Sequence, residues 1–254
     1  MALLKLEHVR RVFSSGKQRV EALKDISFEV DQGDYVAIMG ESGAGKTTLL
    51  NIIATLDKAT SGVIQLDNQD LNQLKEQDAA RFRREQLGFV FQNFNLLDTF
   101  NNRDNIYLPL VLAKKSVAEM ASRLAPIARQ LEITDLLDRY PSEISGGQRQ
   151  RVAAARALIT QPKLVLADEP TGALDSHNAA SLLDEFDQVN DTGQTILMVT
   201  HSAVTASYSK RVLFIKDGVI FHELFRGQQS KKVYLKKISD SLTALAGTGE
   251  EASS

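Results

Sequence analysis

The sequence contains no cysteine among its 254 residues, which excludes disulfides, thiolate metal sites and a cysteine nucleophile and is consistent with a reducing compartment. It also lacks any run of about 18 apolar residues, so we expect no membrane-spanning helix. An excess of charge of one sign is missing too, because 30 basic and 32 acidic residues give a formal net charge of −2. That balance does not favour a nucleic-acid-binding protein. With no long apolar core for a signal peptide at its start, the chain is expected to be cytoplasmic.

Most of the sequence consists of short apolar runs that alternate with segments of helical patterning. Ile26, Phe28 and Val30 alternate with polar residues, as in a half-buried strand, and residues 35–39 form an apolar run that leads into a glycine. A similar run at 163–168 precedes a helical pattern. Strands that alternate with helices predict an α/β domain with a largely parallel sheet. The first stretch of the chain is expected to form an antiparallel β region.

The middle of the chain, from about residue 93 to 160, has mostly helical patterning and is expected to form a helical subdomain inserted in the α/β domain. Pro126 lies inside one of these patterns and should end or kink its helix. The apolar face of that predicted helix consists of Val117, Met120, Leu124, Ile127 and Leu131.

The stretch "GESGAGKT", from Gly40 to Thr47, matches the phosphate-binding loop pattern G-x-x-x-x-G-K-[ST]. Glycines let the backbone wrap a polyphosphate, the lysine supplies a mobile charge, and the threonine hydroxyl can ligate Mg²⁺. A glycine-rich turn between a strand and a helix is the alternative reading. The apolar strand before the loop and the helical run after it favour a P-loop nucleotide-binding core. The expected nucleotide-contacting residues are Gly40, Ser42, Gly43, Gly45, Lys46, Thr47 and Thr48.

Two adjacent carboxylates follow the apolar run of "LVLADEP". Because a phosphate loop precedes them in the sequence, Asp168 is expected to hold Mg²⁺ through a water, and Glu169 to orient and polarise an attacking water. Two acids after a strand can also be a solvated loop or a helix cap. His201 ends another apolar run, "TILMVTH", from which it could hydrogen-bond the γ-phosphate.

A second glycine pair lies in "PSEISGGQRQRVAAARAL", at the start of an arginine-rich helical pattern. Ser145 is a plausible N-cap there, and Gly146 and Gly147 would leave the helix N-terminus open to an anion. One nucleotide does not need two such loops from one chain. Two chains placed head to tail can instead offer the glycine loop of one to the γ-phosphate bound on the other, so that the nucleotide joins them.

This set of motifs resembles the nucleotide-binding subunit of an ATP-binding-cassette (ABC) transporter over nearly the whole chain. "GESGAGKT" is similar to its Walker A motif, "LVLADE" to its Walker B motif and "ISGGQ", with Gln148, to its signature motif. "ISGGQ" departs from the family pattern because Ile144 stands where leucine is usual. Gln92 resembles the Q-loop glutamine, a ligand of the metal and a coupling residue to the membrane subunit. Asp175 in "GALD" resembles the D-loop, and Phe13 the aromatic residue that stacks on adenine.

The resemblance implies an ATPase that uses ATP and Mg²⁺, with Glu169, His201 and Gln92 in catalytic roles. It further implies a homodimer in the ATP-bound state, an integral-membrane permease as partner and, through the permease, a sensor kinase. The protein would then be peripheral on the inner face of the cell membrane. The segment after Gln92, including "NNRDNIYLPL", is the expected docking surface. Nucleic acid is not an expected partner.

Within the family, "DEPTGALDS", "QNFNLL" and "NIYLPLVLA" resemble the branch that serves lipoprotein release and macrolide efflux, and the tail resembles bacitracin-type peptide-antibiotic resistance exporters. A lipoprotein-release or cell-division-type system and a non-transport ABC ATPase are the alternatives. Ribosome-acting cassette proteins carry two cassettes, and chromosome-maintenance ATPases separate the two motifs by coiled coils, which this chain lacks. A GTPase or kinase would leave "ISGGQ" unexplained.

The ATPase domain is expected to span residues 1–227 and to end after a hairpin with an Asp217-Gly218 turn. Residues 228–254 are predicted to form an amphipathic helix and a disordered tail, "GTGEEASS". This helix could lie on anionic lipid, pack against the permease or the partner cassette, or cover its own domain. Its expected apolar residues are Val233, Leu235, Ile238, Leu242 and Leu245.

Overall fold

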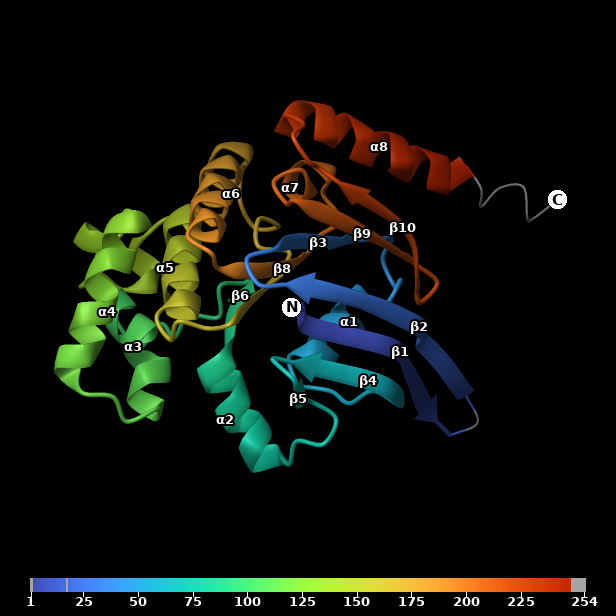
Figure 1. The fold of residues 1–254 in the computed structure, drawn as a ribbon. Helices are drawn as coiled ribbons and strands as arrows, with labels where there is room; N and C mark the ends of the chain where they lie inside the picture. The colour runs from blue at the N-terminus through green and yellow to red at the C-terminus, as the bar shows by residue number, and fades with distance from the viewer. Residues whose placement is uncertain (1, 17, 248–254) are drawn as a thin grey trace.

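A ten-stranded sheet runs through the molecule in the order β5-β4-β1-β2-β10-β9-β3-β8-β7-β6 (Figure 1). The computed structural model describes residues 2–16 and 18–247. The strands are β1 Ala2–Ser15, β2 Gln18–Asp31, β3 Tyr35–Met39, β4 Ser61–Leu66, β5 Gln69–Asp70, β6 Leu87–Phe91, β7 Leu164–Asp168, β8 Thr195–Val199, β9 Arg211–Lys216 and β10 Val219–Phe225.

The strands β6, β7, β8, β3 and β9 form a parallel core, in which each strand pairs in parallel with its neighbours. All residues of β3 and β8 are buried. A strand covered on both faces has no polar face, which explains why these two segments are continuous apolar runs. The predicted largely parallel α/β sheet is confirmed.

The N-terminal part of the sheet is antiparallel, because β1 pairs in this way with β2 and β4, and β4 with β5. In β2 the side chains of Ile26, Phe28 and Val30 are buried while the residues between them are exposed. The predicted alternation and the predicted antiparallel region are both confirmed. The predicted hairpin is present as β9 and β10, joined at Asp217 and Gly218, which both have positive φ.

Helices cover both faces of this sheet. They are α1 Lys46–Ile53, α2 Glu76–Gln86, α3 Asn102–Leu112, α4 Val117–Gln130, α5 Gly146–Leu158, α6 Ser176–Asp191, α7 Ala203–Ala206 and α8 Lys231–Gly247. Within the described residues, 2–16 and 18–247, no helix combines the length and the apolar character needed to cross a bilayer.

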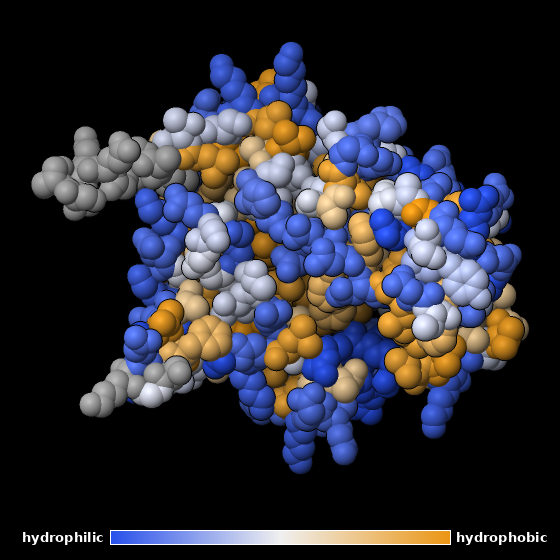
Figure 2. All heavy atoms as spheres, turned by 180° about the vertical axis from the view of Figure 1, so that it is seen from behind, coloured by the Kyte–Doolittle hydropathy of each residue, from blue (hydrophilic) through white to orange (hydrophobic). Residues whose placement is uncertain are grey.

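Alternate residues of β3 belong to two separate cores. Tyr35, Ala37 and Met39 pack with buried residues of α3–α6 and α8, whereas Val36 and Ile38 pack with those of α1, β1 and β2. The helices α3, α4 and α5 form a group at one side of the sheet in Figure 1. Figure 2, seen from behind, shows apolar side chains gathered over this helical part, with a hollowed surface between it and the rest of the molecule.

The helix does not end at Pro126, since α4 continues through it to Gln130, so this part of the expectation is wrong and the kink stays a prediction. Proline removes one backbone donor, but the helix buries Met120, Leu124 and Ala128 in the core, and this packing outweighs the local preference. Val117 is also not part of the buried face, since 74% of its surface is exposed.

The predicted C-terminal helix is present as α8 and lies over α7, β9 and β10 (Figure 1). Tyr234 and Ile238 are fully buried in the core, whereas Val233, which the sequence placed on the apolar face, is 50% exposed. The Tyr234 hydroxyl donates to the Leu224 carbonyl at 2.8 Å. Of the three arrangements considered for this helix, the described part of the chain supports packing against its own domain. The side chain of Leu245 and the predicted disordered tail at 248–254 lie outside the described residues.

Candidate active site

A cavity of about 620 Å³ lies at the carboxyl ends of β3, β7 and β8. It is lined by the predicted phosphate loop after β3, by Asp168 and Glu169 at the end of β7, and by His201 just after β8. The carboxyl ends of parallel strands are where open α/β sheets bind ligands. Residues from three separate predicted motifs are therefore brought together in one cavity. The predicted loop residues in its lining are Gly40, Ser42, Gly43, Gly45, Lys46, Thr47 and Thr48.

The loop leads into α1 through Gly45, which has φ of 102°. A Cβ at this position would lie 2.5 Å from the Ala22 carbonyl oxygen and 2.7 Å from a methyl carbon of Leu23, so only glycine fits. Among the described residues no side chain caps α1, which leaves its first N–H groups for a ligand. A helix N-terminus of this kind favours an anion.

Lys46 is folded back across the loop. Its Nζ donates to the carbonyl oxygens of Gly40 and Glu41 at 2.7 and 2.8 Å. Burial lowers the pKa of Lys46, and the nearby carboxylates of Glu169 and Asp168 oppose that shift. A half-buried ammonium group bonded to neutral carbonyls can readily exchange them for phosphate oxygens.

Glu169 is held at both carboxylate oxygens. Thr200 Oγ1 donates to its Oε2 at 3.0 Å, and the backbone N–H of His201 donates to its Oε1 at 2.9 Å. The His201 ring nitrogen Nδ1 also lies 2.7 Å from that Oε1. Three contacts fix the direction of the carboxylate, which suits a group that must orient a water. The sequence predicted that His201 contacts a phosphate, and the structure joins its ring to Glu169.

Asp168 is the second acid of the cavity. Burial raises its pKa, the neighbouring Glu169 raises it further, and Lys46 opposes both effects. Two close carboxylates with a single ammonium group nearby are short of positive charge. A cation placed between Asp168 and a bound phosphate would supply it.

The predicted signature motif lies outside this cavity. Ser145 caps α5 as predicted, because its Oγ accepts from the Gln148 N–H at 3.2 Å and Gln148 Oε1 accepts from the Ser145 N–H at 2.9 Å. This reciprocal pair is a capping box. We call residues 145–148 the signature loop. The loop does not line the 620 Å³ cavity of its own chain.

The reason predicted for a glycine at position 147 is incomplete. The sequence attributed it to close approach of a nucleotide, but a Cβ there would lie 2.7 Å from Asn178 Cγ in the same chain. Gly147 is buried against α6, so its own chain already excludes a side chain. Gly146 differs, because the nearest heavy atom to an added Cβ is 3.7 Å away, in Leu174.

Three other predicted site residues lie away from the cavity lining. Phe13 is 41% exposed on β1, with the Arg11 guanidinium carbon 4.3 Å from its ring centroid. Gln92 follows β6 and packs against Gly172. Asp175 is the N-cap of α6. Their roles toward the nucleotide stay predictions.

Two polar residues with roles at the site were not predicted. Thr200 is fully buried and holds Glu169. Gln150 is fully buried on α5, and its Nε2 donates to the carbonyl oxygens of Phe91 at 3.1 Å and Pro170 at 2.8 Å. A polar residue just after an apolar strand was a usable signal for Thr200. The partners of Gln150 are 59 and 20 residues away in sequence, so only the fold reveals them.

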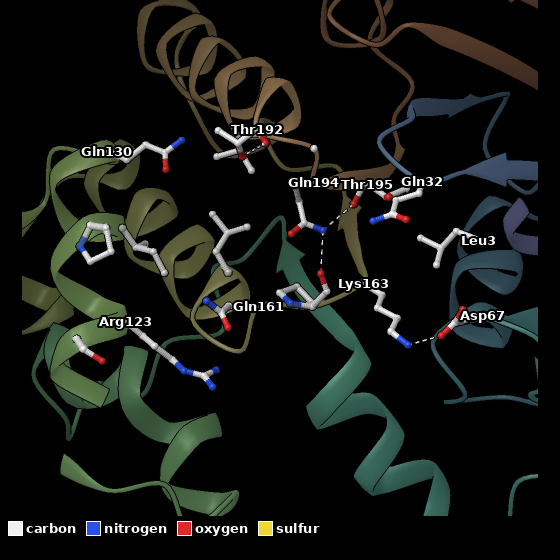
Figure 3. A pocket seen from close by; sticks show the side chains of 17 residues that line it. Leu3, Gln32, Asp67, Arg123, Gln130, Gln161, Lys163, Thr192, Gln194 and Thr195 are labelled. Atoms are coloured by element: carbon white, nitrogen blue, oxygen red, sulfur yellow. Dashed lines mark hydrogen bonds and ion pairs between the residues drawn. The ribbon is translucent and has the colours of Figure 1, made fainter. Parts of the chain in front are cut away.

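A second cavity, of about 760 Å³, lies at the opposite ends of the central strands, near the starts of β7 and β8 (Figure 3). Its charged side chains already have partners. Lys163 pairs with Asp67, and the Arg123 guanidinium contacts Glu119 and the Ile159 carbonyl. Its charged side chains are paired, and its lining contains neither an acid pair nor a glycine loop. We therefore assign the active site to the first cavity.

Comparison with known proteins gives a consistent set of relatives. A family model described as ABC transporter matches residues 23–172. The chain is 47% identical to the ABC transporter ATP-binding protein YxdL of Bacillus subtilis (strain 168) over 253 residues, which cover 99% of this chain and 98% of that protein. It is 44% identical to the bacitracin export ATP-binding protein BceA of Halalkalibacterium halodurans over 248 residues, which cover 97% and 98% of the two chains.

A solved structure is also similar. It is a dimeric post-hydrolysis state of the ATP-binding cassette MJ0796 bound to ADP and Pi, with a TM-score of 0.79 and 36% sequence identity. The match covers 87% of this chain and 98% of that one. The fold predicted from the sequence, a P-loop nucleotide-binding core, is confirmed by this similarity.

Proposed function

The chain belongs to the ABC transporter family, and from this premise we propose that it is the ATP-hydrolysing subunit that powers a membrane permease in resistance to peptide antibiotics. The family predicted from the sequence is thereby confirmed, and so is its ATPase activity. The similarity to BceA supports the peptide-antibiotic branch. Attachment to the inner face of the membrane would come through the permease. No feature of the described residues bears on the predicted sensor kinase.

The observation that carries the proposal is the cavity shared by the phosphate loop, the acid pair and His201. In the proposed site, Lys46 and the N–H groups at the start of α1 bind the phosphates of ATP. Glu169, which Thr200 and His201 orient, accepts a hydrogen bond from the attacking water and polarises it. His201 keeps the carboxylate in place through its backbone N–H and through its ring nitrogen Nδ1, 2.7 Å from Glu169 Oε1.

Magnesium fits the residues at this site. Thr47 and Asp168 both line the cavity and would hold the ion, and the raised pKa of Asp168 indicates that its carboxylate lacks a compensating charge. When bound, the ion neutralises charge on the phosphate oxygens. The described residues contain no group of three or more His, Cys, Asp or Glu side chains able to hold a metal. Most of the coordination would therefore come from ATP and water, as is usual for Mg²⁺.

The signature loop supports a dimer that closes on ATP. It lies outside its own cavity and forms the capped N-terminus of α5, while the similar cassette MJ0796 forms a dimer bound to ADP and Pi. We place Ser145 and Gly146 of one copy against the γ-phosphate held by the other. Hydrolysis and product release would then reopen the pair.

The permease would dock in a groove of about 520 Å³ between α2, β6, α3 and α5. This groove includes residues of the segment predicted to dock. Its lining includes the apolar residues Phe89, Leu108 and Pro109 together with Arg84 and Arg156. Arg156 contacts backbone carbonyls of residues 94 and 95 rather than a carboxylate, and burial lowers its pKa. We expect the docking segment of the permease to carry an acidic side chain flanked by apolar ones.

Steady-state ATP hydrolysis by the purified chain tests the proposal. Glu169→Gln keeps the shape of the side chain but removes the charge that polarises water, so kcat should fall by orders of magnitude while ATP still binds. Chelation with EDTA should abolish hydrolysis by the natural protein. Near-normal turnover of the variant would contradict the role of Glu169. Capture of the permease from detergent-solubilised membranes, lost in Arg156→Glu, tests the docking groove.

A further inference from the structure

Two helices that start near the proposed dimer interface touch at their first turns. Gly147 lies in the first turn of α5 and Asn178 in the first turn of α6. A Cβ at position 147 would lie 2.7 Å from Asn178 Cγ, which is too short for a Cβ contact, and 3.0 Å from Asn178 Cβ, which is tight. The neighbouring Gly146 has no such contact, since 3.7 Å separates its added Cβ from the nearest atom. The packing constraint is thus specific to position 147.

The orientation of Asn178 is fixed by the predicted D-loop aspartate. Asp175 Oδ1 accepts from the Asn178 backbone N–H at 2.9 Å, and its Oδ2 accepts from the side-chain Nδ2 at 2.6 Å. A carboxylate only accepts hydrogen bonds, so the amide nitrogen must face Asp175 and the amide oxygen must face Gly147. One side chain therefore contacts both Asp175 and the signature loop.

A second contact joins the same two helices one turn further along. Arg151 contacts Glu185 at 2.8 Å and the Ser181 hydroxyl at 2.7 Å. Gly147 and Arg151 are four residues apart on α5, and Asn178 and Ser181 are three apart on α6, so both contacts lie along one face of each helix. The two helix starts are thus held at two points.

We propose that Asn178 is a positioning residue that holds the signature loop and Asp175 as one unit against the nucleotide of the partner copy. The inference rests on the proposed function, because the unit acts only when two copies close on ATP. Displacing a helix N-terminus by a fraction of an ångström weakens its contacts with a phosphate in the transition state. The contact therefore bears on kcat rather than on binding of ATP to a single copy.

Kinetics of four variants test this inference. Asn178→Ala removes the amide but leaves the backbone cap, and should lower kcat about 3- to 10-fold. Gly147→Ala should lower kcat at least about 30-fold, because its methyl group forces the helices apart. In the double variant Gly147→Ala/Asn178→Ala the methyl group meets only the remaining Cβ at 3.0 Å, a contact that a shift of a few tenths of an ångström relieves, so kcat should rise well above that of Gly147→Ala. His177 is the exposed neighbour of Asn178, so His177→Ala is the matched control and should hydrolyse ATP at the rate of the natural chain.

Two readouts separate positioning from loss of structure. The Kd of each variant for a fluorescent ATP analogue, measured on dilute monomer, should match that of the natural chain, and circular dichroism should show the same helix content. If the double variant does not rise above Gly147→Ala, the inference is overturned, since the clash with the Asn178 amide is then not what makes the glycine necessary. Unchanged kcat in Asn178→Ala would overturn it equally, even if Gly147→Ala does not fold. If the natural chain neither hydrolyses ATP nor dimerises, the proposed function itself fails.

Discussion

Glu185 is a carboxylic acid buried between α5 and α6, with only 8% of its side chain exposed. Burial raises its pKa to about 7, and the attraction of Arg151 does not offset this effect. Glu132 and Asp184 add to the rise through their negative charge. One of its oxygens, Oε2, has no hydrogen-bond partner among the described residues. The Glu185 carboxyl group therefore binds a proton more tightly in the folded protein than in the unfolded chain.

The pH dependence of stability follows from that difference. Between the unfolded pKa of 4.5 and the folded value of about 7, the folded state binds more protons, so the free energy of unfolding falls as pH rises. The loss corresponds to roughly 3 kcal/mol across the whole window. Glu185→Gln should remove this component, which urea denaturation of both proteins at pH 5, 6, 7 and 8 would measure. Parallel pH profiles for the two proteins would contradict the assignment.

Single residues also show where reasoning from the sequence was sufficient. The order of residues around Lys46 and Glu169 predicted that both belong to one site, because the phosphate loop and the acid pair are local patterns, and both residues do line the same cavity. Thr200, Gln150 and Asn178 were missed. Each contacts a residue distant in sequence, and only Thr200 carried a local signal, its place directly after an apolar strand.

The helix α8 lies after the boundary predicted near residue 227, yet it packs against the domain that precedes this boundary. Its residue Tyr234 is fully buried in the main core and bonded to Leu224, and Lys231 lies 3.2 Å from Asp184 and 3.0 Å from Asp187 on α6. The helix therefore packs into the main core, while the predicted domain boundary near residue 227 stays a prediction.

Two substitutions in adjacent positions measure its contribution. Tyr234→Ala should lower the free energy of unfolding by about 3–5 kcal/mol, the usual cost of removing a buried aromatic ring. Val233→Ala, at a half-exposed position, should change it by less than about 1 kcal/mol. Folded Tyr234→Ala should still bind ATP, because α8 contributes no residue to the cavity. Equal losses in the two variants would contradict the observed packing of α8.

Whole elements were predicted unevenly, for reasons of packing. The strands β3, β7 and β8 and the helical segment after the phosphate loop have strong patterns and were found, whereas β6 was not. The helix α2 was missed, although acidic residues in its first turn and arginines in its last are favourable signals, because it buries only Ala79 and Phe82. The continuation of α4 through Pro126 could not be predicted, since the compensating core contacts come from elsewhere in the chain.

At the scale of the assembly, Gly146 gives a sharper test of the dimer than Gly147 does. Its added Cβ fits within its own chain, so a carboxylate there would act mainly on what the partner copy presents. In a Glu169→Gln background, Gly146→Asp should prevent the ATP-dependent dimer through repulsion of the γ-phosphate. Size-exclusion chromatography with ATP measures this, and ATP binding to the monomer should survive. A full dimer peak would show that the signature loop does not face the partner's nucleotide.

The position of β3 between β9 and β8 has a consequence for synthesis of the chain on the ribosome. The whole phosphate loop has been translated by residue 47, but the strands that pair with β3 lie at 195–199 and 211–216. A nascent chain that ends before them has the loop sequence without the sheet that shapes it. Pairing over such long sequence separations is slow and leaves apolar strands exposed meanwhile. We therefore expect a nascent chain to bind nucleotide only after residue 216 has left the ribosome, when almost the entire cassette has emerged.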